Sequence, residues 1–189
     1  GFIGSHLAHT LAEDTELVVL DDLSTGDPAS IPNQARSVTR NVSERCIVSN
    51  ADIDSDIIFH QAGLISVAQS IKTPYESHTT NATGTVNILD AARQNSSRVV
   101  FASSAAIYGN PDYLPIDEHH PFDPASPYGL DKLTADYYTR LYSDLYDLET
   151  VCLRYFNVFG PGQTGGDYAG VIPVFIKQAL SGADITIHG

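Results

Sequence analysis

Short apolar runs alternate with longer helical patterns along this chain. The runs have the length of strands and lie at residues 17–20, 57–59, 99–102 and 151–153. Between them, Thr79 to Arg93 and about Pro127 to Tyr146 repeat apolar residues every three or four positions, which predicts two long helices. Alternation of this kind is typical of a parallel sheet covered by helices. The sequence therefore predicts an α/β fold, with a doubly wound parallel sheet and helices on both faces.

Turn-forming residues divide the rest of the chain. Pro111 to Pro127 contains five prolines and several acids, which predicts a loop. From Phe156 onward glycine and proline become frequent, so we expect one domain over residues 1–155 and the beginning of a second lobe over 156–189. The chain opens on a glycine turn at Gly1 with no strand before it, and it closes on an alternating, strand-like stretch at 185–189. We expect a fragment that lacks its first strand and most of the second lobe.

Composition excludes several classes of protein. Of the 189 residues, 42% are hydrophobic and 17% charged, which disfavours intrinsic disorder, and no apolar run approaches the ~18 residues of a membrane helix. Ten Lys and Arg against 23 Asp and Glu give a net charge of −13, which argues against nucleic-acid binding. Cys46 and Cys152 have the spacing of neither a zinc site nor a disulfide framework. Nothing indicates secretion, so we expect a cytoplasmic protein with no metal.

Aspartate dominates the acids, with 17 Asp to 6 Glu. We interpret this bias as a hydrated acidic surface suited to the salty cytosol of a halophilic source, where screening shortens charge repulsion. An ordinary acidic bacterial protein is the plainer interpretation.

Two glycines precede the first helical pattern. Gly1 and Gly4 are typical of the second half of a dinucleotide fingerprint, in which glycine lets the backbone approach a pyrophosphate and the helix N-terminus attracts it. A turn with two glycines is also common before a helix that binds no ligand. Asp21 favours the first interpretation, because it ends a strand 17 positions after Gly4, near the ~20-residue offset of a ribose-binding carboxylate. Its charge would repel a 2′-phosphate and residues 22–28 hold no Arg, which favours NAD over NADP.

A serine, a tyrosine and a lysine form the candidate catalytic set. Ser104 ends a strand, and Tyr128 and Lys132 follow it four positions apart on a predicted helix, hence on one face. A tyrosine titrates near ~10, so its use as a base near pH 7 costs roughly 4 kcal/mol, which a neighbouring cation and an oxidised nicotinamide ring can supply. A packed ring beside a solvated lysine is the plainer interpretation of Tyr128 and Lys132. The strand serine and the earlier acid count against it.

Eight segments, taken in order, resemble the extended short-chain dehydrogenases/reductases of the nucleotide-sugar epimerase/dehydratase family. They span essentially all of the chain and lie at residues 1–7, 20–26, 58–63, 81–85, 103–109, 126–129, 153–161 and 168–173. Each is modestly specific, and the eight in register are very specific. The resemblance implies a Rossmann-like NAD-binding domain followed by a smaller substrate-binding lobe. It is strongest to the branch that interconverts UDP-glucose and UDP-galactose.

The resemblance also implies which residues bind the cofactor and the substrate. Phe2 and Ile3, beside Gly1 and Gly4, would offer backbone N–H groups to the pyrophosphate. The adenosine ribose would be wrapped by Asp21, Asp22, Leu23, Ser24, Thr25 and Gly26. The cofactor would also meet Asn41 and Val42 beside adenine, Gln61, Ala62, Gly63, Leu64 and Ile65 after a strand, either Thr80 or Asn81, and Phe156 near the nicotinamide. Asn157, Val171 and Ile172 would meet the diphosphate and uridine of a UDP-sugar. At Asn41 the family's usual aspartate is replaced, which keeps a polar contact and loses a carboxylate.

The implied reaction is NAD-dependent epimerisation at carbon 4 of a UDP-hexose through a transient 4-keto sugar. Tyr128 would take the proton of the 4-hydroxyl, Lys132 would lower the pKa of Tyr128 and hold the nicotinamide ribose, and Ser104 would hydrogen-bond the same oxygen. A dehydratase is the weaker interpretation, because the positions of its acidic pair hold Ala105 and Ala106. A UDP-N-acetylglucosamine 4-epimerase, a nucleotide-sugar decarboxylase and a non-catalytic NAD-sensing module stay open.

Three further expectations complete the picture. By resemblance to the family, the long helices at 79–93 and 127–146 would pair two copies into a homodimer through a four-helix bundle. His119 and His120 are interpreted as solvated rather than as a metal pair, since no third ligand has suitable spacing. His60, at a strand end, is interpreted as a satisfied core histidine.

Overall fold

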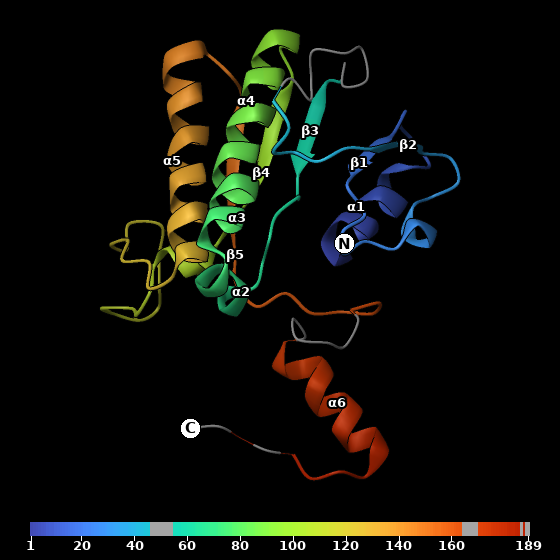
Figure 1. Cartoon of the computed structure of the whole chain (residues 1–189), viewed down its shortest axis with the longest axis vertical. Coiled ribbons are helices and arrows are strands. Elements are labelled where there is room, and N and C mark those ends of the chain that lie inside the picture. Colours follow the sequence, from blue (N-terminus) through green and yellow to red (C-terminus); the bar gives the residue numbers. More distant parts are fainter. Residues whose placement is uncertain (46–54, 164–169, 186, 188–189) are drawn as a thin grey trace. The chain divides into compact units, whose positions relative to one another are not determined.

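The computed structural model describes residues 1–45, 55–163, 170–185 and 187 of the chain. It divides into two compact units, one made of Gly1 and Ile3–Tyr155 and the other made chiefly of residues 156–189. The first unit holds all the described strands and the helices α1 to α5, and the second holds α6 (Val171–Ser181) (Figure 1).

Parallel strand pairing organises the first unit. β1 (Val18–Asp21) pairs with β2 (Arg36–Thr39), and a three-stranded sheet has the order β3 (Ile57–His60), β4 (Arg98–Ser104) and β5 (Thr150–Tyr155). Every described pairing is parallel, which confirms the predicted α/β class. The predicted single sheet is present as two sheets, because no strand in the described ranges pairs with both β1 and β3. In the larger sheet the register sets Ser104 opposite Tyr155, at the carboxyl ends of β4 and β5.

Helices connect these strands. They are α1 (Phe2–Leu11), η1 (Pro28–Ser30), α2 (Val67–Lys72), α3 (Pro74–His78), η3 (Thr79–Thr83), α4 (Gly84–Asn95), η4 (Ala105–Ile107) and α5 (Pro127–Tyr146). The helix predicted over 79–93 is helical throughout, but its first five residues form a π-helical segment, a feature that often marks functional sites. The helix predicted over 127–146 has these bounds: the Ser126 hydroxyl accepts the N–H of Gly129 at 3.1 Å, and Asp147 ends it in the left-handed conformation.

The main core lies between the larger sheet and the helices α4 and α5, which lie alongside it in Figure 1. Its buried members are Leu89, Ala92, Val99, Phe101, Ala135, Tyr142 and Leu148. Phe101 is fully buried at the centre of β4, so its truncation to alanine would cost about 3–5 kcal/mol. The core thus fixes α5 against β4, the two elements that carry the predicted catalytic residues.

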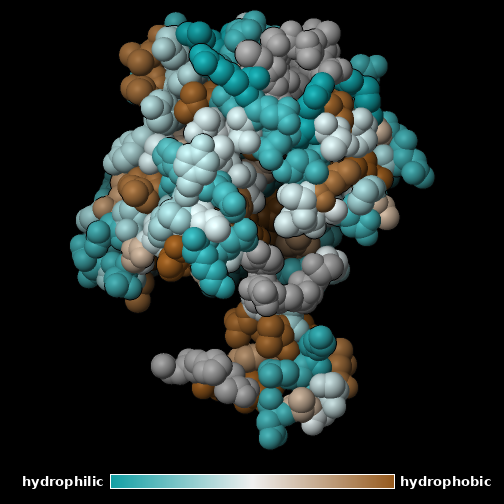
Figure 2. Space-filling view, viewed as in Figure 1, coloured by the Kyte–Doolittle hydropathy of each residue, from teal (hydrophilic) through white to brown (hydrophobic). Residues whose placement is uncertain are grey.

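The outer side of α5 keeps a row of apolar residues in contact with solvent. Its exposed members are Leu130, Tyr137, Tyr138, Leu141 and Leu145. Figure 2 shows hydrophobic patches over α5, with others elsewhere in the same view, among them over α6. We call these five residues the α5 stripe.

Of the other local predictions, some are confirmed and others differ from the structure. The loop predicted over 111–127 is confirmed up to Ser126, but β2 was not foreseen, because Val38 is its one apolar residue. His120, interpreted as solvated, is buried: Tyr108 and Tyr113 pack on its ring, and its Nε2 accepts the N–H of Asp112 at 3.0 Å. The strand expected at 185–189 lies partly outside the described residues, and Ile185 and Ile187 belong to neither helix nor strand.

Candidate functional site

The carboxyl end of β4 meets the first turn of α5, and this contact joins Ser104 to Tyr128. The Ser104 side chain lies near enough to the Tyr128 phenol to lower its pKa by hydrogen bonding, and the Ser104 hydroxyl accepts the N–H of Ala106 at 3.2 Å. The close approach requires Gly129, because a Cβ at that position would lie 2.7 Å from the Ala106 carbonyl oxygen. The structure therefore brings two of the three predicted catalytic residues into direct contact.

Lys132 lies one helical turn further along α5, on the same face as Tyr128. Its side chain is buried, its Nζ donates to the Ala102 carbonyl oxygen at 2.9 Å, and the Phe101 ring lies beneath it at 5.0 Å. Burial lowers the pKa of Lys132 to about 8. An ammonium has three N–H donors, and Ala102 accepts one of them. Lys132 is thus a buried cation with donors to spare for a ligand.

The ionisation of Tyr128 differs from the sequence-based expectation. Burial raises the pKa of Tyr128 above its ordinary value, and the hydrogen bond from Ser104 acts in the opposite direction. Lys132 is not among the causes of this shift, and its ammonium donates to Ala102; the expected lowering of the Tyr128 pKa also includes the nicotinamide ring of bound NAD. Without a ligand, Tyr128 is therefore a protonated phenol.

The loop after β3 is held by a buried asparagine of the π-helical segment. Asn81 Nδ2 donates to the Leu64 carbonyl oxygen at 3.0 Å, and the Leu64 N–H donates to Asn81 Oδ1 at 3.0 Å. A Cβ at Gly63 would lie 2.8 Å from Asn81 Oδ1 and 3.2 Å from Lys132 Nζ. The sequence left the cofactor contact open between Thr80 and Asn81. The structure engages both ends of the Asn81 amide with Leu64, so this side chain shapes the loop.

The other residues of the loop after β3 differ in their exposure to solvent. Ala62, Leu64 and Gln61 are half-buried, and Ile65 is exposed. The Nε2 of Gln61 is buried without a hydrogen-bond partner among the described residues. A buried donor without an acceptor costs about 1–3 kcal/mol, so it points to an acceptor supplied by a ligand or by water.

A second group of predicted residues gathers around Asp21 at the end of β1. The main-chain nitrogen of Gly1 lies 3.7 Å from its carboxylate, and the Leu23 N–H donates to its Oδ1 at 2.8 Å. Leu23 has a φ of 58°, and a Cβ at Gly26 would lie 3.3 Å from the Asp21 oxygens, so the 21–26 turn is folded tightly around this carboxylate. Gly1 caps α1 without a side-chain hydrogen bond, and the first turn of α1 holds no acid. The predicted pyrophosphate and ribose segments therefore lie side by side.

The residues expected beside adenine behave differently from one another. Asn41 Nδ2 donates to Asp22 at 3.0 Å, which joins it to the ribose turn, where Ser24 also donates to Asp22. The side chain of Val42 is buried in the core with Ile88, so only its backbone can face a ligand. Thr25 is exposed on the turn.

The predicted substrate contacts belong to the second unit. Phe156 and Asn157 follow β5, and Val171 and Ile172 begin α6. Their roles stay predictions. The motif segment over 168–173 lies partly outside the described residues.

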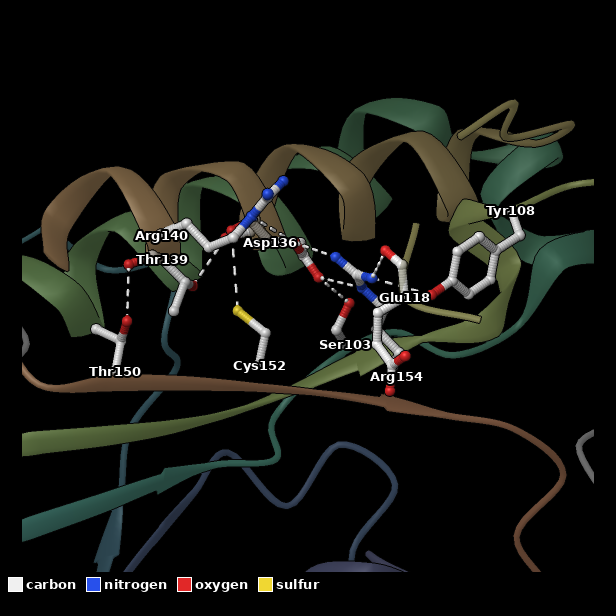
Figure 3. A network of polar contacts seen from close by, with 10 residues as sticks. Ser103, Tyr108, Glu118, Asp136, Thr139, Arg140, Thr150, Cys152 and Arg154 are labelled. Atoms are coloured by element: carbon white, nitrogen blue, oxygen red, sulfur yellow. Dashed lines mark hydrogen bonds and ion pairs between the residues drawn. The ribbon is translucent and has the colours of Figure 1, made fainter. Parts of the chain in front are cut away.

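Sequence reasoning missed a buried ion network behind Ser104. Asp136, one turn beyond Lys132, is fully buried and accepts from Ser103 Oγ at 2.8 Å, from Arg140 Nε at 3.0 Å and from Arg154 Nε at 3.2 Å (Figure 3). Its four-residue spacing from Lys132 on a predicted helix was the available signal. Asp131 was missed likewise; it is buried and accepts from Ser77 Oγ at 2.6 Å and His78 Nδ1 at 2.9 Å.

The structure also bears on His60, on candidate metal ligands and on the question of a membrane helix. His60 is buried and its Nε2 bonds the Thr85 hydroxyl at 3.0 Å, which confirms a satisfied core histidine. In the described ranges no three His, Cys, Asp or Glu side chains gather as metal ligands, and no helix is long and apolar enough to cross a membrane.

The residues present fit NAD. Asp21 offers a carboxylate for the ribose hydroxyls, the glycine-capped N-terminus of α1 suits a pyrophosphate, and Lys132 and Gln61 hold buried donors that lack acceptors. These features lie on four separate elements: β1, α1, the loop after β3 and α5. A dinucleotide is the class of ligand long enough to use all of them.

Comparison with known proteins agrees with this geometry. A putative UDP-glucose 4-epimerase of Methanocaldococcus jannaschii is 39% identical over 193 residues, covering 100% of this chain and 63% of the relative. The structure of UDP-glucose 4-epimerase from Thermotoga maritima with UDP-glucose matches at a TM-score of 0.94 and 31% identity, over 100% of this chain and 63% of that one. UDP-N-acetylglucosamine 4-epimerase from Methanobrevibacter ruminantium M1, in complex with UDP-N-acetylmuramic acid, matches at 0.90 and 34% over the same shares. This chain thus spans less than two thirds of the proteins it matches.

A family model also matches the whole of residues 1–189, and its description is the NAD dependent epimerase/dehydratase family. The match extends over both units, and the description of the family names NAD as its cofactor. The chain belongs to the NAD-dependent epimerase/dehydratase family.

Proposed function

We propose that the protein epimerises carbon 4 of a UDP-hexose, interconverting UDP-glucose and UDP-galactose through a transient 4-keto sugar. The observation that carries the proposal is the contact of Ser104 with Tyr128, one helical turn from the buried ammonium of Lys132. Relatives and solved structures named as UDP-sugar 4-epimerases support it.

In this mechanism the chain's own residues bind the sugar oxygen and move one proton. The 4-hydroxyl would lie against Tyr128 and Ser104, with Tyr128 as the base that takes its proton and Ser104 donating to the same oxygen as it becomes a carbonyl. Bound NAD supplies a reversible two-electron acceptor for the hydrogen on carbon 4. Turning the keto sugar over before its reduction would give the epimer, with Tyr128 returning the proton.

The high pKa of Tyr128 in the structure sets a requirement on this mechanism. Burial favours the neutral phenol, and the Lys132 ammonium is bonded to Ala102. A positive charge must therefore arrive with the ligands, or Lys132 must turn toward Tyr128, before the phenol can serve as a base near neutral pH. Lys132, Asp21 and the Gln61–Ile65 loop would hold the cofactor, and Phe156, Asn157, Val171 and Ile172 would complete the cofactor and substrate contacts.

A 4-epimerase that acts on UDP-N-acetylglucosamine is the second candidate, favoured by the match to the Methanobrevibacter enzyme. A dehydratase is disfavoured by Ala105 and Ala106, which lie directly after Ser104 and carry no proton-transferring group. A non-catalytic NAD-sensing module is disfavoured by the contact between Ser104 and Tyr128, since cofactor binding alone does not need it.

The α5 stripe supports a homodimer in which α4 and α5 of each copy form a four-helix bundle. Its residues recur with helical spacing along one side of α5, which a monomer would leave in water. Sedimentation of the wild-type protein and of Leu141→Glu tests this. We expect a dimer that the charge dissociates, and a monomeric wild type would contradict it.

Product analysis tests the function. The complete gene product, supplied with NAD, is incubated separately with UDP-glucose and UDP-N-acetylglucosamine, and the epimers are separated by chromatography. We expect conversion of UDP-glucose. Tyr128→Phe should lose turnover by 10²-fold or more, on the order of a lost general base, while NAD affinity stays unchanged. Tyr75→Phe, at a tyrosine of α3 that is 81% exposed and lies outside the α5 stripe, is the matched control.

Conversion of only the N-acetylated sugar would select the second candidate. An NADH absorbance change without epimer formation would indicate a different reaction of the family. NAD binding without either would indicate the sensing module.

A further inference from the structure

The loop from Tyr108 to Ser126 separates the two residues of the Ser104–Tyr128 contact along the chain. Ser104 and the short helix η4 precede it, and Ser126 and Pro127 start α5 directly after it. A loop of this length has no helix or strand of its own to fix its shape. Contacts from elsewhere must therefore hold it if the hydroxyls of Ser104 and Tyr128 are to stay together.

Arg154 of β5 supplies such contacts at two points of the loop. Its Nη1 donates to the Tyr108 hydroxyl at 2.9 Å and to the Glu118 carbonyl oxygen at 3.3 Å, and its guanidinium lies 4.9 Å from the Phe122 ring centroid (Figure 3). One side chain thus ties the beginning and the middle of the loop to the sheet.

The guanidinium is itself fixed by Asp136 of α5. Arg154 Nε and Nη2 donate to the two oxygens of this carboxylate, at 3.2 Å and 3.4 Å. A forked pair of this kind sets the orientation of the guanidinium as well as its position. Asp136 is fully buried and the side chain of Arg154 is 15% exposed, so the pair is shielded from solvent.

The same carboxylate reaches the strand that carries Ser104. Ser103 Oγ donates to Asp136 Oδ2 at 2.8 Å, and Ser103 directly precedes Ser104 on β4. Asp136 also lies two helical turns from Tyr128 on one face of α5. The network therefore joins all three parts whose relative placement decides the contact: the end of β4, the first turns of α5 and the loop between them.

We propose that Arg154 is a positioning residue of the active site, which holds the Ser104–Tyr128 pair in its reactive geometry by tying the 108–126 loop to Asp136. The inference rests on the proposed function, since the geometry matters to the reaction at this pair. A misplacement of about 1 Å at a reacting group can cost 10²-fold in rate. A residue that only positions the reacting pair can therefore change kcat measurably.

Arg140 provides a matched control within the network. Its Nε donates to the same carboxylate at 3.0 Å, but its guanidinium lies over the Tyr137 ring at 4.7 Å and, among the described residues, donates no hydrogen bond to the loop. Its contact with the loop is a longer one, 6.0 Å to the Phe122 ring centroid, and its side chain is half-exposed. Removing Arg140 takes a positive charge from Asp136 and leaves both Arg154 hydrogen bonds to the loop in place. A purely electrostatic or structural role of Asp136 would make the two arginines equivalent.

The test compares Arg154→Gln, Arg154→Lys, Tyr108→Phe and Arg140→Gln in the complete gene product. The readouts are kcat and KM for the UDP-sugar, the NAD dissociation constant, and hydrogen exchange of amides 108–126. We expect Arg154→Gln to lower kcat roughly 10- to 100-fold and to speed exchange in the loop, with NAD affinity within about twofold. Arg154→Lys, which loses the fork, should be intermediate, and Arg140→Gln should match the wild type.

Equal kcat in Arg154→Gln and Arg140→Gln would overturn the proposal, as would faster loop exchange at unchanged kcat. If Arg154→Gln fails to fold, Tyr108→Phe decides: it removes one hydroxyl, should lower kcat severalfold and speed exchange near Tyr108, and a wild-type result in both would overturn the proposal. A wild-type protein without epimerase activity would contradict the proposed function instead. Even in that case, unchanged hydrogen exchange of the loop in the Arg154 variants would show that Arg154 does not hold the 108–126 loop.

Discussion

Lys132 donates a hydrogen bond to the main-chain oxygen of Ala102, 2.9 Å away, in the buried space between α5 and β4. A neutral carbonyl compensates an ammonium poorly for the loss of water, and no carboxylate is paired with Lys132 in the described residues. The chain thus retains a destabilising cation at the predicted active site. Such a group is typical of a site whose full set of partners arrives with a ligand.

The stability of the protein should therefore rise with pH in the alkaline range. Burial lowers the pKa of Lys132 to about 8 from 10.5. Between these values the unfolded state binds more protons than the folded state, so the free energy of unfolding increases as pH rises. We expect this group to add about 2–3 kcal/mol between pH 7 and pH 10.

Urea denaturation of the wild type and of Lys132→Met, repeated across this pH range, isolates this effect. The variant should be more stable than the wild type at pH 7, and the difference should shrink as pH rises. Lys72→Met, at an exposed lysine, is the control. A parallel pH dependence in wild type and Lys132→Met would contradict the prediction.

Gly63 should be required for the cofactor loop. A Cβ at this position would lie 2.8 Å from Asn81 Oδ1, so Gly63→Ala must displace the amide that holds both main-chain groups of Leu64. We expect NAD affinity to fall roughly tenfold or more, with a stability loss of about 1–3 kcal/mol. Titration of NAD by calorimetry measures the affinity.

Gly84→Ala is the matched control for Gly63. Its Cβ would also approach another atom to 2.8 Å, but that atom is the Val42 side chain in the core. We expect a similar loss of stability with a smaller loss of NAD affinity, because the displaced Val42 side chain lies in the core and only its main chain is expected beside adenine. An equal loss of affinity in the two variants would show that the effect is not specific to the loop.

Much of the fold could be predicted because its signals are local. The helix at 127–146 combines an apolar stripe with a Ser-Pro start, and both are readable in the sequence. β2 carries a single apolar residue, Val38, and gains its place by pairing with β1, which no local pattern shows. The π-helical turn at 79–83 was missed for the same reason, since Asn81 is held by Leu64, 17 residues away in the chain.

The candidate site divides in the same way. Ser104, Tyr128 and Lys132 follow from motif spacing; in the structure Ser104 lies beside Tyr128, and Lys132 donates to Ala102. Asp136 and Arg154 were missed because the four-residue spacing of Asp136 from Lys132 does not indicate its partner, which lies on a strand 18 residues further along the chain. The expected effect of Lys132 on Tyr128 stays a prediction for the NAD-bound protein; sequence patterns do not show that Ala102, a backbone group, accepts a hydrogen bond from the ammonium.

His60 should make the protein sensitive to acid. Burial, with a smaller contribution from Lys132, lowers the pKa of His60 to about 3. Between pH 6.5 and 3 the unfolded state binds a proton at this histidine and the folded state does not. The free energy of unfolding therefore falls as pH falls, and this group contributes a loss of about 3 kcal/mol at pH 4.

His60→Gln should reduce this acid dependence, because an amide can still donate to the Thr85 hydroxyl and does not titrate. His119→Gln, at an exposed histidine, is the control. Thermal unfolding between pH 4 and pH 7 measures both. Identical slopes for His60→Gln and the wild type would contradict a buried neutral His60.

Salt should stabilise the protein at neutral pH. The net charge of −13 repels itself across a surface of this size, and raising the ionic strength from 0.1 M to 1 M shortens the screening length from about 10 Å to about 3 Å. We expect the unfolding temperature at pH 7 to rise steadily with added KCl. The same titration near pH 4.6, the isoelectric point of the sequence, removes most of the net charge and serves as the control. An increase of the same size at both pH values would assign the effect to hydration of apolar surface, and a fall at pH 7 would contradict adaptation of this acidic surface to salt.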